Sequence, residues 1–313
     1  MRTSRQEEPS FFLLMLGKGD AMLSLEKHEN KTGWMMVLPA TILIAIFGYL
    51  PIVQGFLLSL QTGKGVNLTW SGFANYARLF QDSIFWTTLG NTLLYAVVHI
   101  PIMLFLALVI ALLLNDKRIP FKGFFRTCIF LPCVTSLVSY AILFRSIFAV
   151  DGVVNNLLLT LHMVSEPIPF LLHPVWAKVV IILALIWRNT GYFMVFFLAA
   201  LQGIDPQIHE AARIDGCKPS QSLFRITIPM LSPIIFLTMI MSMISTLQIF
   251  DEVVNLTNGG PGDATRSISQ YIYDLSFTYV PSYGYSAAVS YVVLLIVLVF
   301  TLVQKRGKER NYG

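Results

Sequence analysis

The stretch Ile204-Asp205-Pro206-Gln207-Ile208-His209-Glu210-Ala211-Ala212-Arg213-Ile214-Asp215-Gly216-Cys217 is a short polar segment between two long apolar runs. It has the pattern of a helix with defined ends. Asp205 is a favourable N-cap, and Pro206 follows at the first helical position, where its missing N–H costs nothing. Gly216 is expected to end the helix in a left-handed conformation. The alanines between are small and favour helix, so the segment predicts an exposed helix with one smooth face, suited to docking into a groove on a partner.

The composition around this helix indicates a membrane protein. Hydrophobic residues make up 55% of the 313 residues and charged residues only 12%, against roughly 25% charged in soluble domains. The mean hydropathy is +0.67. A bilayer core needs about 20 mostly apolar residues per helix, and the chain holds six such runs, at 34–60, 86–114, 123–147, 174–201, 231–250 and 284–304. A disordered chain, a disulfide scaffold and most cytosolic enzymes are excluded.

The basic residues predict how the chain is oriented. Sixteen of the 22 Lys and Arg residues lie before the first run, after the last, or in the loops that follow the second and fourth runs, counting Arg126 just inside the third run. Only Lys64, Arg78 and Arg266 lie in the other loops. Positively charged loops stay in the cytoplasm. Both termini are therefore expected to be cytoplasmic, and the positive net charge is explained without nucleic acid.

The loops between the runs also carry local signals. Residues 75–80 suggest a short amphipathic helix, 147–173 are expected to fold in short pieces, and 258–262 hold a strong turn signal. Before the first run, Phe11 to Leu16 is too short for the core of a signal peptide. This segment is expected to form a short cytoplasmic or interfacial helix, and Met22 is an alternative start.

The polar loop resembles a known family signature. Glu210-Ala211-Ala212, with Gly216 four residues on and Ile228-Pro229 after it, is similar to the "EAA" loop of permease subunits of binding-protein-dependent ABC importers. The resemblance extends over about residues 34–305. The residues that resemble the carbohydrate subfamily are Asp215, Phe224, Leu231, Pro233, Asn75-Tyr76, Gly90-Asn91-Thr92, Asn255 to Pro261, Thr265 and Tyr273. Cys217 departs from the pattern, which more often has Ala there. The alternative interpretation is an ordinary capped linker helix.

This resemblance implies an all-α fold, the six-helix transmembrane domain of a type I ABC importer in a bacterial cytoplasmic (inner) membrane. Residues 1–33 would be a cytoplasmic segment, 34–304 the permease domain with its coupling loop at 202–230, and 305–313 a basic cytoplasmic tail. The segment 147–173 has no long insertion, and in this respect the chain resembles the smaller sugar permeases of the maltose, glycerol-3-phosphate and arabino-oligosaccharide group. The residues expected to couple to an ATPase are Glu210, Ala211, Ala212, Asp215 and Gly216.

The implied machine has several parts. They are a second homologous permease subunit, an ATPase dimer, an extracytoplasmic sugar-binding protein, and a sugar or oligosaccharide that crosses the bilayer by alternating access. The chain itself has no P-loop, because none of its Gly-Lys pairs has the required glycine upstream and Ser or Thr downstream. It is therefore not expected to be an enzyme or to hold a cofactor or metal. ATP and Mg²⁺ would bind to the partner ATPase.

Polar groups within the runs are candidates for the sugar path, because such groups are costly in a membrane. Ser242, Ser245 and Thr246 share one helical face that Ile249 extends, and Asn189 and Tyr192 lie in the fourth run. The resemblance places the path between these two helices and would have these six residues line it. Ser and Thr also pack helices together, which is the competing interpretation. Arg188 must meet water, a carboxylate or carbonyls, and a structural or gating contact is the hypothesis for it.

Two other functions fit the sequence less well. An ion-coupled secondary transporter would carry paired carboxylates deep in its helices, whereas Asp251 and Glu252 lie at the end of a run. A membrane-embedded enzyme would need a catalytic cluster at membrane depth, and none is visible. The prediction is therefore a transmembrane permease subunit of a sugar importer.

Overall fold

The computed structural model describes residues 33–65, 67–116 and 118–312. The expected N-terminal segment and its short helix lie outside the described residues, except for Gly33. The chain divides into two compact units, residues 1–58 and residues 59–313, and each is treated by itself.

The first unit is built on one apolar helix, Gly33–Ser59, which is long enough to cross a membrane. It contains a wide π turn, η1 (Ala45–Tyr49), followed by α2 (Leu50–Ser59). The Leu50 N–H reaches back to the Ala45 carbonyl. Pro51 follows directly, and a proline ring clashes with the carbonyl four residues before it in a regular helix. The widened turn is a local adjustment that accommodates such a residue.

The second unit contains the remaining long helices. They are α4 (Ser83–Asn115), α8 (Pro174–Gln202), α14 (Tyr283–Tyr312) and a helical stretch over Pro219–Leu247. That stretch comprises α10 (Pro219–Ser222), the π turn η2 (Leu223–Thr227) and α11 (Ile228–Leu247). Counting the first unit, the described residues form five helices long and apolar enough to span a membrane. The prediction of an all-α, multi-span fold is confirmed.

The expected third span, 123–147, is broken rather than continuous. It forms α5 (Lys122–Val134) and α6 (Leu137–Ile147), which meet at 97°. Pro132 weakens the last turn of α5, and Thr135 has an extended backbone. The Thr135 hydroxyl donates to the Pro132 carbonyl over 2.7 Å, which satisfies an acceptor at the break. Counted as one span, this bent pair brings the total to six.

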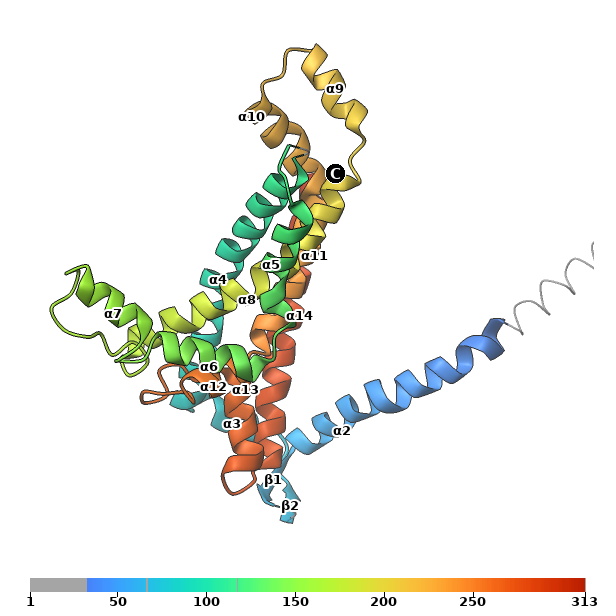
Figure 1. Cartoon of the computed structure of the whole chain (residues 1–313). Helices are drawn as coiled ribbons and strands as arrows, with labels where there is room; N and C mark the ends of the chain where they lie inside the picture. The colour runs from blue at the N-terminus through green and yellow to red at the C-terminus, as the bar shows by residue number, and fades with distance from the viewer. Residues whose placement is uncertain (1–32, 66, 117, 313) are drawn as a thin grey trace, which may run out of the picture. The chain divides into compact units, whose positions relative to one another are not determined.

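The core of the second unit is formed by α4 packed along α8, with α5 and α11 against them. Buried residues of α4 and α8, such as Met103, Ala107, Met194 and Phe197, form one cluster with Leu231 of α11. Figure 1 shows α9 and α10 at one end of this bundle and α3, α6, α12 and α13 towards the opposite end. The two ends of the bundle therefore carry different sets of short helices.

The end opposite α9 is built from short elements. They are the antiparallel hairpin β1 (Gln61–Lys64) and β2 (Asn67–Trp70), α3 (Ala74–Phe80), α7 (Val153–Thr160), α12 (Asp251–Leu256), α13 (Ile268–Tyr273) and η3 (Asp274–Thr278). The predicted helix near 75–80 and the short pieces within 147–173 are confirmed. So is the turn at 258–262, where Asn258, Gly259 and Gly262 have positive φ. The hairpin was not predicted.

Residues from α4 hold the loop between α12 and α13 in place. The Asn91 amide donates to the carbonyls of Asp263 and Arg266, both over 3.1 Å. The Tyr95 hydroxyl donates to the Thr265 carbonyl over 2.9 Å, and the Thr92 hydroxyl accepts from the Ile268 N–H. Buried backbone groups need such partners. The loop is therefore fixed to the longest helix of the bundle.

Asp82 anchors the same end of the molecule. Its carboxylate caps α4 by accepting from the N–H groups of Ile84 and Phe85. It also accepts from the hydroxyls of Tyr271 and Tyr285. Burial alone raises the pKa of Asp82, but these hydrogen bonds outweigh it and bring the pKa below its ordinary value. One carboxylate thus ties α4 to α13 and α14.

The approach of α5 to α8 gives a stability prediction. A Cβ at Gly191 of α8 would lie 2.0 Å from the Ile129 carbonyl oxygen of α5. Gly191→Ala is expected to destabilise the purified protein by about 2 kcal/mol, because overpacking forces the helices apart. Gly90→Ala, in the interior of α4 with open space at its Cβ, is the matched control and should leave the thermal unfolding temperature unchanged or higher. Equal unfolding temperatures for the two variants would contradict the close packing.

Candidate functional site

A polar pocket of about 220 Å³ lies where α8 meets the end of α11. The lining side chains come from α6, α8, α11, α12 and the residues between the last two: Leu137, Leu185, Arg188, Asn189, Ser245, Thr246, Gln248, Ile249, Phe250, Asp251 and Glu252. Four of the six residues predicted to line the sugar path are in this set, namely Asn189, Ser245, Thr246 and Ile249. The pocket therefore brings together residues from the two helices that the sequence singled out.

The pocket exists because the chain stops being helical after Leu247. The residues Gln248 to Phe250 connect α11 to α12 and free backbone carbonyls. The Ser267 hydroxyl donates to the Ile249 carbonyl over 2.6 Å, and the Ser269 hydroxyl donates to the Leu247 carbonyl over 3.2 Å. Carbonyls at a helix break must be satisfied within the protein when water is absent. The anchored loop before α13 therefore stabilises the break.

Arg188 forms an ion pair across this pocket. Its Nη1 lies 3.5 Å from Oε1 of Glu252, and its guanidinium carbon lies 5.5 Å from the centre of the Tyr140 ring. Burial raises the pKa of Glu252, and the Arg188 cation opposes that rise. The sequence predicted that Arg188 would meet water, a carboxylate or carbonyls, and in the structure its partner is the Glu252 carboxylate. Sequence reasoning missed Glu252 and Tyr140, because both come from other elements.

The two other predicted path residues lie outside this pocket. Ser242 is almost fully buried, and its Oγ has no hydrogen-bond partner among the described residues. The Tyr192 ring packs against Phe193 and Phe196, 5.1 Å from each ring centre, and is partly exposed. His99 of α4, which was not predicted, is buried beside the pocket with Nδ1 3.5 Å from the Thr246 hydroxyl. The stripe of Ser and Thr thus divides between pocket lining and helix packing.

The loop between α8 and α11 has the predicted capped helix. Asp205 caps α9 (Pro206–Ile214) by accepting from the Gln207 N–H over 2.9 Å. At the other end Gly216 has φ +75°, and the Cys217 N–H donates to the Ala212 carbonyl over 2.9 Å. This pairing is the Schellman motif, which satisfies the last carbonyls of a helix. Both predicted ends of the helix are confirmed.

The residues expected to couple to an ATPase do not share one environment. Glu210, Ala211, Asp215 and Gly216 are exposed, whereas Ala212 is buried. Ala212 faces a small cavity beside α10, where the ring of His209 lies 3.2 Å from the Ser222 hydroxyl. Ile214 is 87% exposed and Phe224 is 67% exposed. The loop therefore presents exposed apolar side chains next to the exposed coupling candidates.

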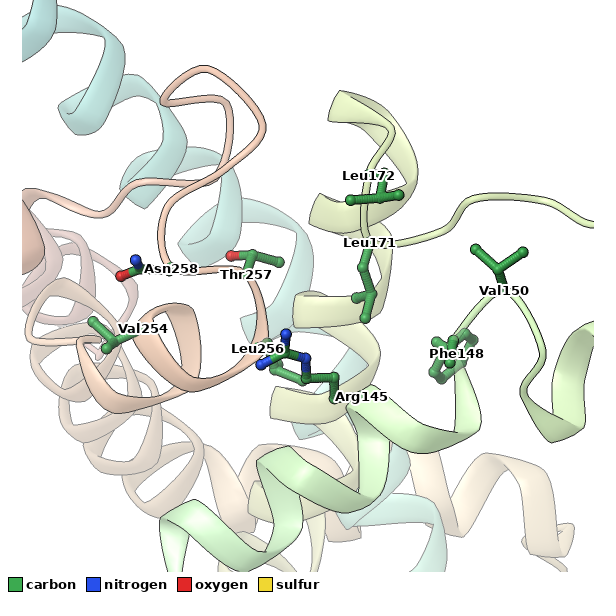
Figure 2. A pocket seen from close by; sticks show the side chains of 10 residues that line it. Arg145, Phe148, Val150, Leu171, Leu172, Val254, Leu256, Thr257 and Asn258 are labelled. Carbon is green, nitrogen blue, oxygen red and sulfur yellow. The ribbon is translucent and has the colours of Figure 1, made fainter.

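A third, more apolar cavity of about 290 Å³ lies at the end opposite α9. It is lined by the end of α6, the segment before α8 and the end of α12, and Figure 2 shows these side chains around it. Arg145 supplies the charged group in its lining. No sequence pattern indicated this cavity, because its walls come from three segments far apart in the chain.

Comparison with known proteins identifies the family. The sequence profile of the family described as "Binding-protein-dependent transport system inner membrane component" matches residues 80–308. This chain belongs to that family. The permease is therefore an inner-membrane component of a transport system that depends on a binding protein, and the interpretation as an ion-coupled secondary transporter is not favoured.

Individual relatives support the assignment over nearly the whole chain. The permease is 51% identical to the lactose transport system permease protein LacF of Rhizobium radiobacter, over 90% of this chain and 95% of that protein. Its fold matches a bacterial ABC transporter that imports the acidic polysaccharide alginate, with a TM-score of 0.79, 26% identity, and 92% and 99% of the two chains covered. A similar match, at 25% identity and TM-score 0.79, covers 91% of this chain and 96% of that transporter, crystallised with an alginate pentasaccharide-bound periplasmic protein.

The ion pair at the pocket gives the second prediction. Glu252→Ala is expected to destabilise the permease by about 3 kcal/mol, because it leaves the Arg188 charge buried without a partner. The double variant Arg188→Met with Glu252→Leu should recover most of that loss, since removing both charges removes the desolvation penalty as well. Thermal unfolding of the unmodified protein, Glu252→Leu, Arg188→Met and this double variant closes a double-mutant cycle that measures the coupling. Additive effects would mean that the two side chains do not interact.

Proposed function

We propose that this permease forms one half of the transmembrane pathway of an ATP-driven importer for a neutral disaccharide of the lactose type. The single observation that carries the proposal is the pocket between α8 and α11. Asn189, Ser245 and Gln248 give it neutral hydrogen-bonding groups, and Phe250 an aromatic face. A sugar needs hydrogen-bond partners for its hydroxyls and an apolar surface for its ring. The substrate named for LacF supports the choice of sugar.

The pathway requires partners. A second, homologous permease subunit would complete the walls of the pocket, to which this subunit contributes α6, α8, α11 and α12. An extracytoplasmic binding protein would deliver the sugar at the end that carries α12 and α13. A dimer of ATPase subunits, holding ATP and Mg²⁺, would engage the opposite end. Both termini of the permease would then lie in the cytoplasm, in agreement with the distribution of Lys and Arg.

Coupling would take place through α9. Four of the coupling candidates are exposed at this short helix: Glu210, Ala211, Asp215 and Gly216. The apolar side chain of Ile214 is exposed beside them, and its exposure to water is unfavourable unless a partner covers it. We expect α9 to lie in a groove of the ATPase. Closure of the ATPase dimer would move α9 and with it the ends of α8 and α11. The pocket would then open alternately to the two sides of the membrane.

The coupling role is tested at Gly216. Gly216→Val is expected to lower both ATPase binding and sugar uptake at least about tenfold, because a β-branched residue is strained at positive φ and shifts the end of α9. Membrane insertion should be unchanged, since the residue is exposed with open space around it. Uptake in proteoliposomes and co-purification of the ATPase measure the effect.

Two variants control for the Gly216 substitution. Gly216→Asn should keep most of the activity, because asparagine tolerates the left-handed conformation. Gly203→Ala lies at the start of the same loop with an ordinary φ of −81° and should behave like the unmodified protein. Normal coupling in Gly216→Val would disprove the role of α9.

The sugar path is tested at the pocket. Asn189→Ala combined with Ser245→Ala should weaken lactose transport about thirtyfold, because each of the two lost hydrogen bonds to a neutral ligand contributes on the order of 1 kcal/mol. The matched control is Ser242→Ala, the same change one turn earlier on α11 but outside the pocket lining. Uptake of labelled lactose at saturating binding protein measures both. If Ser242→Ala weakened lactose uptake as much as the double variant does, the Ser and Thr residues of α11 would serve helix packing rather than sugar binding.

A further inference from the structure

The charged groups of the pocket are few and belong to one cluster. Among the described residues that line it, Arg188, Asp251 and Glu252 carry formal charges. One cation and two carboxylates leave the pocket with a net charge of −1 when all are ionised. The other polar side chains in the lining, Asn189, Ser245, Thr246 and Gln248, are neutral. The pocket is therefore negative while Glu252 is ionised, and its formal charge is zero without Glu252.

Arg188 still has donors to offer. A guanidinium has five N–H donors, and the ion pair with Glu252 uses one nitrogen at 3.5 Å. That separation is longer than the ~2.7–2.9 Å of a strong charge-assisted bond. The Nε atom is buried and has no hydrogen-bond partner among the described residues. The side chain is therefore a ready ligand for an anion, held by a single, loose carboxylate.

Glu252 is placed to compete with such an anion. It lies in the first turn of α12 and is itself buried, with Arg188 on α8 opposite. Its helix is held by the hydrogen bond from Ser267 to Ile249 and by the packing of α12 on α6 and α8. The Glu252 carboxylate is therefore held beside the guanidinium and stays there when a neutral ligand enters. An anionic ligand would have to displace it and leave it buried without a partner.

We propose that Glu252 is a specificity residue, which occupies the charge of Arg188 and makes the pocket accept neutral sugars while rejecting carboxylated or sulfonated ones. This inference rests on the proposed function of the pocket as a sugar site. Without Glu252, Arg188 would lose its ion-pair partner, and Asp251 would be the carboxylate left in the lining among the described residues. The same pocket would then suit an acidic sugar.

Three probes that share one skeleton test the proposal. They are lactitol, which is neutral, lactobionate, which is anionic, and 1-amino-1-deoxylactitol, which is cationic. Binding of each is measured on the assembled permease–ATPase complex by the ligand-induced shift of thermal unfolding over a concentration series. The unmodified complex should bind lactitol and bind lactobionate at least about tenfold more weakly, since like charges repel at short range in a partly buried site.

Glu252→Gln should gain about tenfold or more in lactobionate affinity, because it keeps the shape of the side chain and frees Arg188. Asp251→Asn is the matched control. It removes a carboxylate from the same pocket, one that forms no ion pair with Arg188 among the described residues, and should gain much less. Arg188→Gln/Glu252→Gln should lose the gain, because the cation that would bind the anion is gone.

Arg188→Gln keeps the proposal testable if Glu252→Gln folds poorly. It leaves two carboxylates and should bind the cationic probe more tightly and lactobionate more weakly than the unmodified complex does. Lactobionate binding that stays weak in Glu252→Gln while lactitol still binds would overturn the specificity role alone. Loss of lactitol binding in both single variants would overturn it too, as the pair would then be structural. Failure of the unmodified complex to bind lactitol or lactose would overturn the sugar-site assignment itself.

Discussion

A membrane interior offers no hydrogen-bond partners, so each interruption of a helix there must be satisfied by the protein. This constraint shapes the second unit of the permease. The break between α5 and α6 uses the Thr135 hydroxyl, and the break after α11 uses the hydroxyls of Ser267 and Ser269. Leu137, at the start of α6, and Ser245, near the end of α11, both line the pocket. The polar site is therefore located where two breaks meet the continuous helix α8.

The breaks also explain how a guanidinium is tolerated midway along α8. A regular helix opposite Arg188 would present apolar side chains and saturated backbone groups. The turn of chain after α11 instead allows α12 to begin beside α8, and its first turn brings Glu252 to within 3.5 Å of Arg188. The arrangement depends on the loop that Asn91, Thr92 and Tyr95 hold on α4. The pocket, the ion pair and this loop are consequently one cooperative structure.

Local patterns in the sequence predicted those parts of the structure that local interactions determine. The cap at Asp205 and the left-handed end at Gly216 each depend on contacts within a few residues, and both are found. The pairing of Arg188 with Glu252 joins residues 64 positions apart, so no periodicity could indicate it. The same reason explains why Tyr192, on the correct helix, was expected in the pocket. The spacing along α8 predicts which residues share a face with Tyr192, but it does not predict the side from which α11 packs against α8.

The chain order links the two ends of the molecule. α8 carries Arg188 and Asn189 and ends at Gln202, directly before the loop that holds α9, while α10, η2 and α11 leave that loop and reach the pocket at Ser245. Both helices that wall the pocket therefore begin or end beside α9. The 20 residues of α11 span about 30 Å at ~1.5 Å per residue, so a helix that moves as a rigid rod carries a displacement of its loop end to the pocket. In the proposed mechanism α9 would need no separate relay, because the helices that would receive its movement are also the helices that would hold the sugar.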